Sequence, residues 1–157
     1  MIVNWENYIQ QNKYSECMLI STLNAYYYLS GEYIKQDSKK YENFVDLCKG
    51  RSGSAFHIEK VRNKLGLKVL WEGVSLFDLS KKMRHKKIPL PMEFVVWEKH
   101  YGFHSTLIVD HETKTDAYRI TNFKWQTTLN GWIFVEDAAH FRSNVLKIKS
   151  YRLFGLK

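Results

Sequence analysis

The chain has 157 residues, of which 45% are hydrophobic and 15% aromatic, as in one compact domain with a full core. It contains no run of roughly 18 uninterrupted apolar residues, so no membrane span is expected, and its start, MIVNWENYIQ, lacks the features of a signal peptide. The formal net charge of +8 favours acidic partners. The densest basic run, residues 81–87, reads as a solvated surface or as a nucleic-acid patch, but no nucleic-acid motif accompanies it.

Apolar periodicity in the first half of the chain predicts helices. The expected helices cover residues 15–30, 38–48, 55–65 and 75–85. Gly31 and Gly66 stand where the first and third of these should end, and Ser54 is placed to cap the start of the third.

The second half is rich in β-branched and aromatic residues and predicts strands instead. The expected strands cover residues 68–73, 90–99, 104–110, 117–123, 131–136 and 144–153. Helices followed by strands indicate an α+β fold with an antiparallel sheet. Because no linker or repeat interrupts the chain, residues 1–157 are expected to form one domain.

Cys17 opens the first apolar helix after a polar stretch. With Ser15 at the N-cap, the thiol lies in the first turn, where free backbone N–H groups and the helix dipole stabilise a thiolate. A lowered thiol pKa is therefore expected, which suits a nucleophile. The alternative is that Cys17 is a small core hydrophobe, as Cys48 is expected to be. Two cysteines form no disulfide framework, so a reducing, cytoplasmic setting is expected.

The segment FHSTLIVDHETKTDAYRITNF supplies a base and an orienting group. A hairpin that pairs Asp110 with Asp116 also places His104 opposite Asn122, because residues directly opposite share a face of the sheet. A one-residue slip would send Asn122 to the other face. The arrangement predicts a Cys–His–Asn site in which an amide oxygen orients the imidazole.

The oxyanion formed by attack on a carbonyl needs hydrogen-bond donors. The backbone N–H of Cys17 is one, and the side-chain amide of Gln11 is the best placed second donor, followed by Gln10. No cofactor or metal is expected, because two cysteines and scattered histidines show no zinc-ligand spacing. His100 and His111 are expected in solvent-facing loops.

The order Gln11, Cys17 opening an apolar helix, GFHSTLIVD and then YRITNF resembles the papain-like cysteine peptidases. It looks closest to their C39-like branch of small bacterial peptidases. The resemblance implies a papain-like fold with nucleophile Cys17, base His104, orienting residue Asn122 and oxyanion donor Gln11. Members often have glycine after the cysteine, where this chain has Met18.

The expected activity is a thiol hydrolase that cleaves a peptide or amide bond in a peptide or protein substrate, with acidic substrates favoured by the charge. One alternative keeps the triad for acyl transfer or deamidation. Another keeps the fold without the chemistry, as a basic pseudoenzyme that binds an acidic partner. Composition, rich in Lys, Asn, Tyr and Ile, is typical of an AT-rich bacterial or phage genome.

Overall fold

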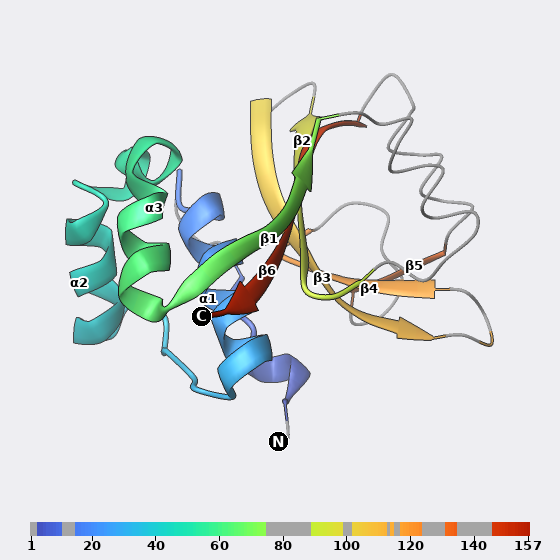
Figure 1. Ribbon diagram of the computed structural model, residues 1–157, viewed down its shortest axis with the longest axis horizontal. Coiled ribbons are helices and arrows are strands. Elements are labelled where there is room, and N and C mark those ends of the chain that lie inside the picture. Colours follow the sequence, from blue (N-terminus) through green and yellow to red (C-terminus); the bar gives the residue numbers. More distant parts are fainter. Residues whose placement is uncertain are drawn as a thin grey trace.

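The computed structural model describes residues 3–10, 15–74, 89–98, 102–112, 114, 117–123, 131–134 and 146–157. Its α-helices are α1 (Cys17–Ser30), α2 (Lys39–Leu47) and α3 (Ser54–Leu65), with short 3-10 turns η1 (Trp5–Asn7) and η2 (Arg51–Gly53). Its strands are β1 (Leu67–Gly73), β2 (Met92–Glu98), β3 (Gly102–Glu112), β4 (Ala117–Thr121), β5 (Trp132–Phe134) and β6 (Leu146–Leu156). The helices stand to one side of a strongly twisted sheet (Figure 1).

The sheet is antiparallel throughout its described pairs, with the strand order β1-β6-β2-β3-β4-β5. The last strand thus returns to lie between β1 and β2. The α+β prediction, with helices first and an antiparallel sheet after them, is confirmed. The six expected strands and the first three expected helices are all found; the expected helix over residues 75–85 and the basic run over residues 81–87 lie outside the described residues.

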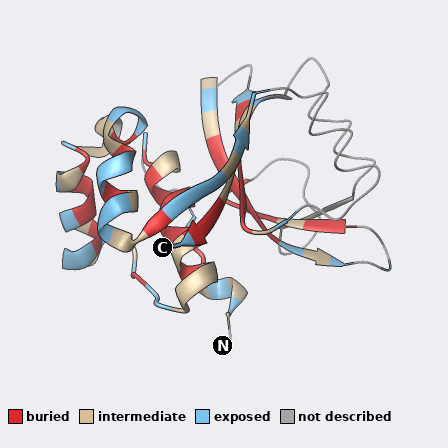
Figure 2. Ribbon diagram, in the orientation of Figure 1, coloured by how far each residue is buried: buried red, intermediate tan, exposed pale blue. Residues whose placement is uncertain are grey.

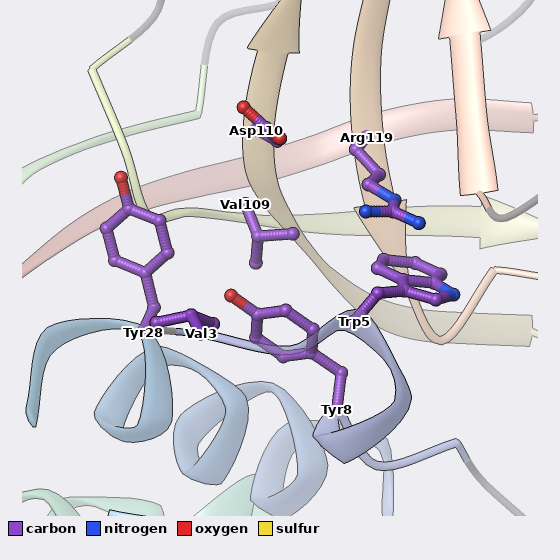
Figure 3. A pocket seen from close by; sticks show the side chains of 7 residues that line it. All are labelled: Val3, Trp5, Tyr8, Tyr28, Val109, Asp110 and Arg119. Carbon is purple, nitrogen blue, oxygen red and sulfur yellow. The ribbon is translucent and has the colours of Figure 1, made fainter. Parts of the chain in front are cut away.

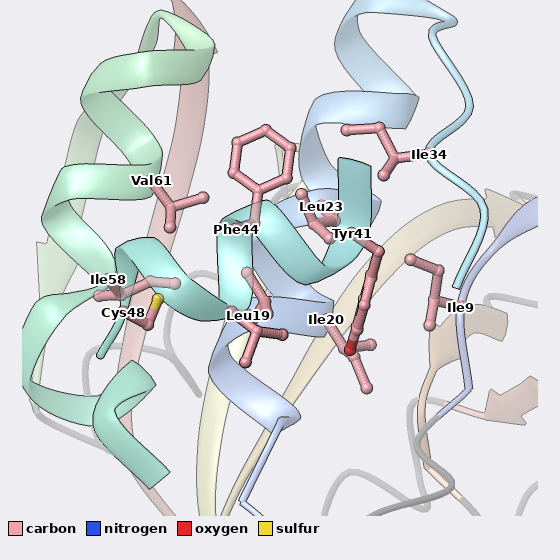
Figure 4. Packing of buried hydrophobic residues seen from close by; sticks show 11 residues of the cluster. Ile9, Leu19, Ile20, Leu23, Ile34, Tyr41, Phe44, Cys48, Ile58 and Val61 are labelled. Atoms are coloured by element: carbon pink, nitrogen blue, oxygen red, sulfur yellow. The ribbon is translucent and has the colours of Figure 1, made fainter. Parts of the chain in front are cut away.

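α1 is the central helix, because it contacts both β3 and α3. The helical core lies between α1, α2 and α3, and Leu19, Tyr41 and Val61 are among its fully buried members (Figure 4). An inter-layer core joins α1 to β3 and β6 through residues such as Ala25 and Leu107. Burial therefore holds α1 between two packed layers.

The opposite face of the sheet has its own core, which we call the outer-face core. Its members are Met92, Phe94, Val96, Ile108, Tyr118, Ile120, Phe123 and Tyr151. In β2, and in β3 as far as Ile108, even-numbered residues belong to this face, whereas odd-numbered ones such as Leu107 face α1. Figure 2 shows the edge strand β1 as largely exposed, in contrast to the buried start of β2. No helix in the described ranges is long and apolar enough to cross a membrane.

Glycine ends two of the helices as expected. Gly31 and Gly66 have φ of 75° and 68°, the left-handed conformation that terminates a helix at little cost for glycine. The predicted cap of α3 is wrong by one residue: Gly53 is the N-cap, and Ser54 is the first helical residue. The Ser54 hydroxyl instead donates to the main-chain oxygen of Ser15, 3.1 Å away, which ties α3 to the segment before α1.

Gly53 is expected to tolerate no side chain. A Cβ on this residue would lie 1.9 Å from the main-chain oxygen of Cys48, so the backbone must move. We expect Gly53→Ala to lower the free energy of unfolding by about 3 kcal/mol. A Cβ on Gly66 would meet no atom within 4 Å, so only the left-handed φ of this residue opposes a side chain. Gly66→Ala should therefore lower the free energy of unfolding by about 1 kcal/mol. Urea unfolding of both variants measures the difference; a smaller loss for Gly53→Ala would contradict the steric explanation.

Candidate active site

Cys17 is the first residue of α1, as the sequence predicts, but the cap differs. Glu16 is the N-cap, and its main-chain oxygen accepts the first helical hydrogen bond from Ile20 N–H at 2.9 Å. Ser15, expected as the cap, lies one residue further back with φ of 66°. The thiol nevertheless lies in the first turn, where the N–H groups of the helix are unsatisfied.

A buried ion pair anchors this helix start. The Glu16 carboxylate is fully buried and binds Arg51 Nε at 2.6 Å. Arg51 also reaches Glu42 of α2, with Nη2 2.6 Å from Oε1. Sequence reasoning overlooked both residues of the buried pair, although an acidic residue directly before a candidate nucleophile is a recognisable signal.

The Cys17 thiol faces three backbone N–H groups. One belongs to Ser105 of β3, and the others are those of Met18 and Cys17 itself. These donors favour the thiolate, but burial of the half-buried residue outweighs them and raises the pKa of the Cys17 thiol, to which the charge of Glu93 adds. The lowered thiol pKa expected from the sequence is therefore wrong, because desolvation exceeds the stabilisation by the helix terminus.

His104 lies beside Asn122, but not in the predicted register. The observed pairs are Leu107 with Thr121 and Ile108 with Ile120, a shift of two residues, and a β-bulge follows Ile108. The predicted hairpin loop is also wrong, because β3 continues to Glu112. Before the bulge the shift is even, so residues there keep their predicted faces, whereas beyond it the shift is three. His104 and Asn122 lie on the side before the bulge and remain close.

The contact between them runs from His104 Nε2 to the main-chain oxygen of Asn122, 2.6 Å away. The sequence predicted the side-chain amide as the orienting group. Asn122 directly follows β4 and has φ of 55°, which turns its carbonyl away from the ladder. Because a carbonyl oxygen only accepts, the bond places the proton on Nε2 and leaves Nδ1 as the basic nitrogen of the neutral ring.

His104 and Ser105 lie on one segment of β3, and their side chains point to opposite faces of the sheet. β4 pairs with β3 no further than Leu107, so the segment of β3 that holds His104 and Ser105 extends past the end of β4. The Ser105 hydroxyl lies 2.9 Å from that of Ser21, one helical turn after Cys17. Thus α1 lies on this segment, and the thiol meets the residue that follows His104.

A second buried carboxylate lies behind the thiol. Glu93 of β2 is fully buried, accepts from the Ser105 hydroxyl at 2.6 Å and pairs with Arg152 Nη1 of β6 at 2.9 Å. Arg62 Nη2 of α3 lies 3.9 Å from the same carboxylate. Sequence reasoning overlooked this cluster; its signal is the isolated charge within the apolar strand MEFVVW.

The other residues singled out in the sequence have different outcomes in the structure. Gln11 lies outside the described residues, and Gln10 is exposed. His111 is not in a loop: it belongs to β3, is half-buried and stacks on Tyr118 with ring centroids 4.3 Å apart. Cys48 is a fully buried member of the helical core, as expected. Met18 packs against that same core.

No group of three or more His, Cys, Asp or Glu side chains in the described ranges is arranged to hold a metal ion. Comparisons with protein-family models, with curated proteins and with solved structures find no match for this chain. The function is therefore argued from the chemistry of the site.

Proposed function

We propose that this protein is a cysteine hydrolase of the papain-like type, related to the C39-like peptidases, that cleaves a peptide or amide bond. The observation that carries the proposal is the meeting of the Cys17 thiol with the Ser105 N–H, one residue from His104, whose ring is oriented by Asn122. A thiol, an oriented imidazole and helix-terminal N–H groups are the parts that acyl transfer to cysteine requires.

The positions of the groups suit this chemistry. The thiol meets a backbone N–H of β3, so it lies near the plane of the sheet, at the edge of β3 beyond the described end of β4. Strand alternation directs the Ser105 side chain toward α1 and the neighbouring His104 toward the opposite face. We propose that the imidazole reaches the sulfur around this edge, beside which the Asn122 carbonyl holds the ring.

The reaction begins with Cys17 as a thiol, in keeping with its raised pKa. His104 Nδ1 accepts the thiol proton as sulfur attacks the carbonyl carbon, and the Cys17 N–H stabilises the oxyanion, with Gln11 proposed as its second donor. The imidazolium then protonates the leaving amine, and water releases the acyl group. Acyl transfer or deamidation would use the same residues and differ only in the substrate.

An exposed aromatic pair beside His104 supports a substrate with an apolar side chain. Trp97 and Phe103 are direct cross-strand partners, 40% and 63% exposed, with ring centroids 4.9 Å apart. By strand alternation both share the face of Ser105. A peptide that reaches Cys17 along this edge would cover them.

Alkylation by iodoacetamide tests the site without knowledge of the substrate. We expect Cys17 to be labelled at neutral pH while Cys48, which is fully buried, stays unlabelled until the protein unfolds. His104→Ala should slow the labelling of Cys17, because the base that takes the thiol proton is lost. Mass spectrometry of the two cysteine peptides measures both rates. Equal and slow labelling of the two thiols would refute the proposal.

One observation favours a second candidate, a pseudoenzyme that uses the site for binding: burial raises the pKa of Cys17 instead of lowering it. Together with the net charge of +8, this suits an acidic partner. The pseudoenzyme would keep its biological activity in Cys17→Ala. Loss of that activity in a folded Cys17→Ala protein would reject it.

A further inference from the structure

A separate pocket of about 200 Å³ lies beside the C-terminal half of α1, which contributes Tyr28 to its lining (Figure 3). It is enclosed by the N-terminal segment, α1, β3 and β4. Its lining residues are Val3, Trp5, Tyr8, Tyr28, Val109, Asp110 and Arg119. Cys17 and Tyr28 are 11 positions apart in one helix, or about 16 Å along its axis. The pocket is therefore distinct from the candidate active site.

Tyr8 is the feature that points to a ligand. The residue is only 7% exposed, and its ring packs against Trp5 and Tyr27 with centroids 5.8 Å and 5.3 Å away. Its hydroxyl is directed into the pocket, toward the space between Tyr28 and Val109 (Figure 3), and bonds to no group in the described part of the chain. The hydroxyl is thus available to a polar ligand that enters the pocket, and one hydrogen bond to it would contribute about 1 kcal/mol.

One wall of the pocket is acidic and rich in phenols. Asp110 stands at its rim, exposed, and accepts one hydrogen bond through Oδ1, from the His111 N–H at 2.8 Å. Burial raises the pKa of Tyr8 and of Tyr28, and the negative charge of Asp110 raises both further. Both phenols thus stay protonated at neutral pH, and their oxygens and ring faces suit a cation beside the carboxylate.

A positive charge stands next to Asp110 in the same pocket. Arg119 of β4 is the direct cross-strand partner of Asp110. Its guanidinium lies over Trp5, with Cζ 3.9 Å from the ring centroid, which limits the orientations of the group. A stacked guanidinium directs its N–H bonds outward in its own plane, the geometry that binds a carboxylate.

We propose that this pocket binds a free α-amino acid, with the ammonium group beside Asp110, Tyr8 and Tyr28 and the carboxylate on Arg119. Val3 and Val109 supply apolar surface for the ligand's side chain. The volume is below the roughly 300 Å³ at which pockets for drug-sized ligands begin, so a ligand of few atoms is expected. The adjacent opposite charges of Asp110 and Arg119 favour a zwitterion over a simple cation or anion.

Isothermal titration calorimetry with glycine, alanine, valine and leucine tests the proposal, with propionate and ethylammonium as probes that carry only one of the two charges. We expect at least one amino acid to bind at least tenfold more tightly than either probe. Tyr8→Phe, which removes only the hydroxyl, should weaken binding about tenfold, the equivalent of one hydrogen bond of about 1.4 kcal/mol. Asp110→Asn, at an exposed position where folding is not at risk, should weaken it as well.

Tyr26→Phe is the matched control, because the Tyr26 hydroxyl donates to Glu32 on the surface, outside the pocket. This variant should bind the amino acid as tightly as the unmodified protein does. Cys17→Ala should also bind normally, which separates this pocket from the proposed hydrolase site. Absence of binding at millimolar amino acid would overturn the proposal. The proposal would also be overturned if Tyr8→Phe and Asp110→Asn bound the amino acid as tightly as the unmodified protein does. Loss of amino-acid binding in Cys17→Ala would overturn it as well.

Discussion

Replacing His104 by alanine is expected to lower kcat for peptide or amide hydrolysis by a factor of about 10²–10⁴, the usual contribution of a positioned general base. The thiol of Cys17 is protonated at neutral pH because burial raises its pKa, so attack depends on transfer of the proton to the imidazole. Cys17→Ala should remove the activity altogether. Release of a fluorescent amine from a mixture of peptide amides measures both effects.

Cys48→Ala is the control for this experiment. That thiol is buried in the helical core, so the variant should lose stability but keep its kcat. Unchanged turnover in a folded His104→Ala protein would contradict the assignment of the base.

A variant of Asn122 separates the two ways in which this residue can orient His104. Asn122→Gly keeps the main-chain carbonyl and accommodates the φ of 55°. If the carbonyl orients the ring, as the 2.6 Å contact indicates, Asn122→Gly retains most of the activity. If the side-chain amide is the orienting group, the kcat of Asn122→Gly should fall toward that of His104→Ala.

Glu93→Gln is expected to have the second large effect, on stability and on the thiol together. The substitution leaves Arg152 and the mostly buried Arg62 without their buried carboxylate partner, which should lower the free energy of unfolding by about 3 kcal/mol. It also removes a negative charge that raises the pKa of Cys17. The rate of alkylation of Cys17 should therefore rise at lower pH than in the unmodified protein.

Glu72→Gln is the matched control, because Glu72 pairs with the same Arg152 at 3.4 Å but is 65% exposed. Its effect on unfolding should stay within about 0.5 kcal/mol. Urea unfolding and the pH dependence of iodoacetamide labelling measure the two quantities. An alkylation profile that does not move, or moves to higher pH, would show that the charge of Glu93 does not act on the thiol.

The amino-acid sequence by itself determined the order and type of the described elements. Apolar periodicity and β-branched runs are local signals, and the helix-ending glycines Gly31 and Gly66 act within one turn. For the same reason the place of Cys17 at the start of α1 was predictable. The closeness of His104 and Asn122 was predictable too, because a hairpin brings its two strands together in any nearby register.

Only the tertiary structure decided how these groups interact. The bulge after Ile108 and the length of β3 set the register of the hairpin. The turn at Asn122 brings its main-chain oxygen, instead of the predicted side-chain amide, to His104. The direction of the Cys17 pKa shift depends on desolvation between α1 and β3, which no local pattern reports. Glu93 with Arg152, and the pocket around Tyr8, join segments far apart in the chain. Burial and long-range charge arise only when distant segments pack, so these features could not be predicted from the sequence.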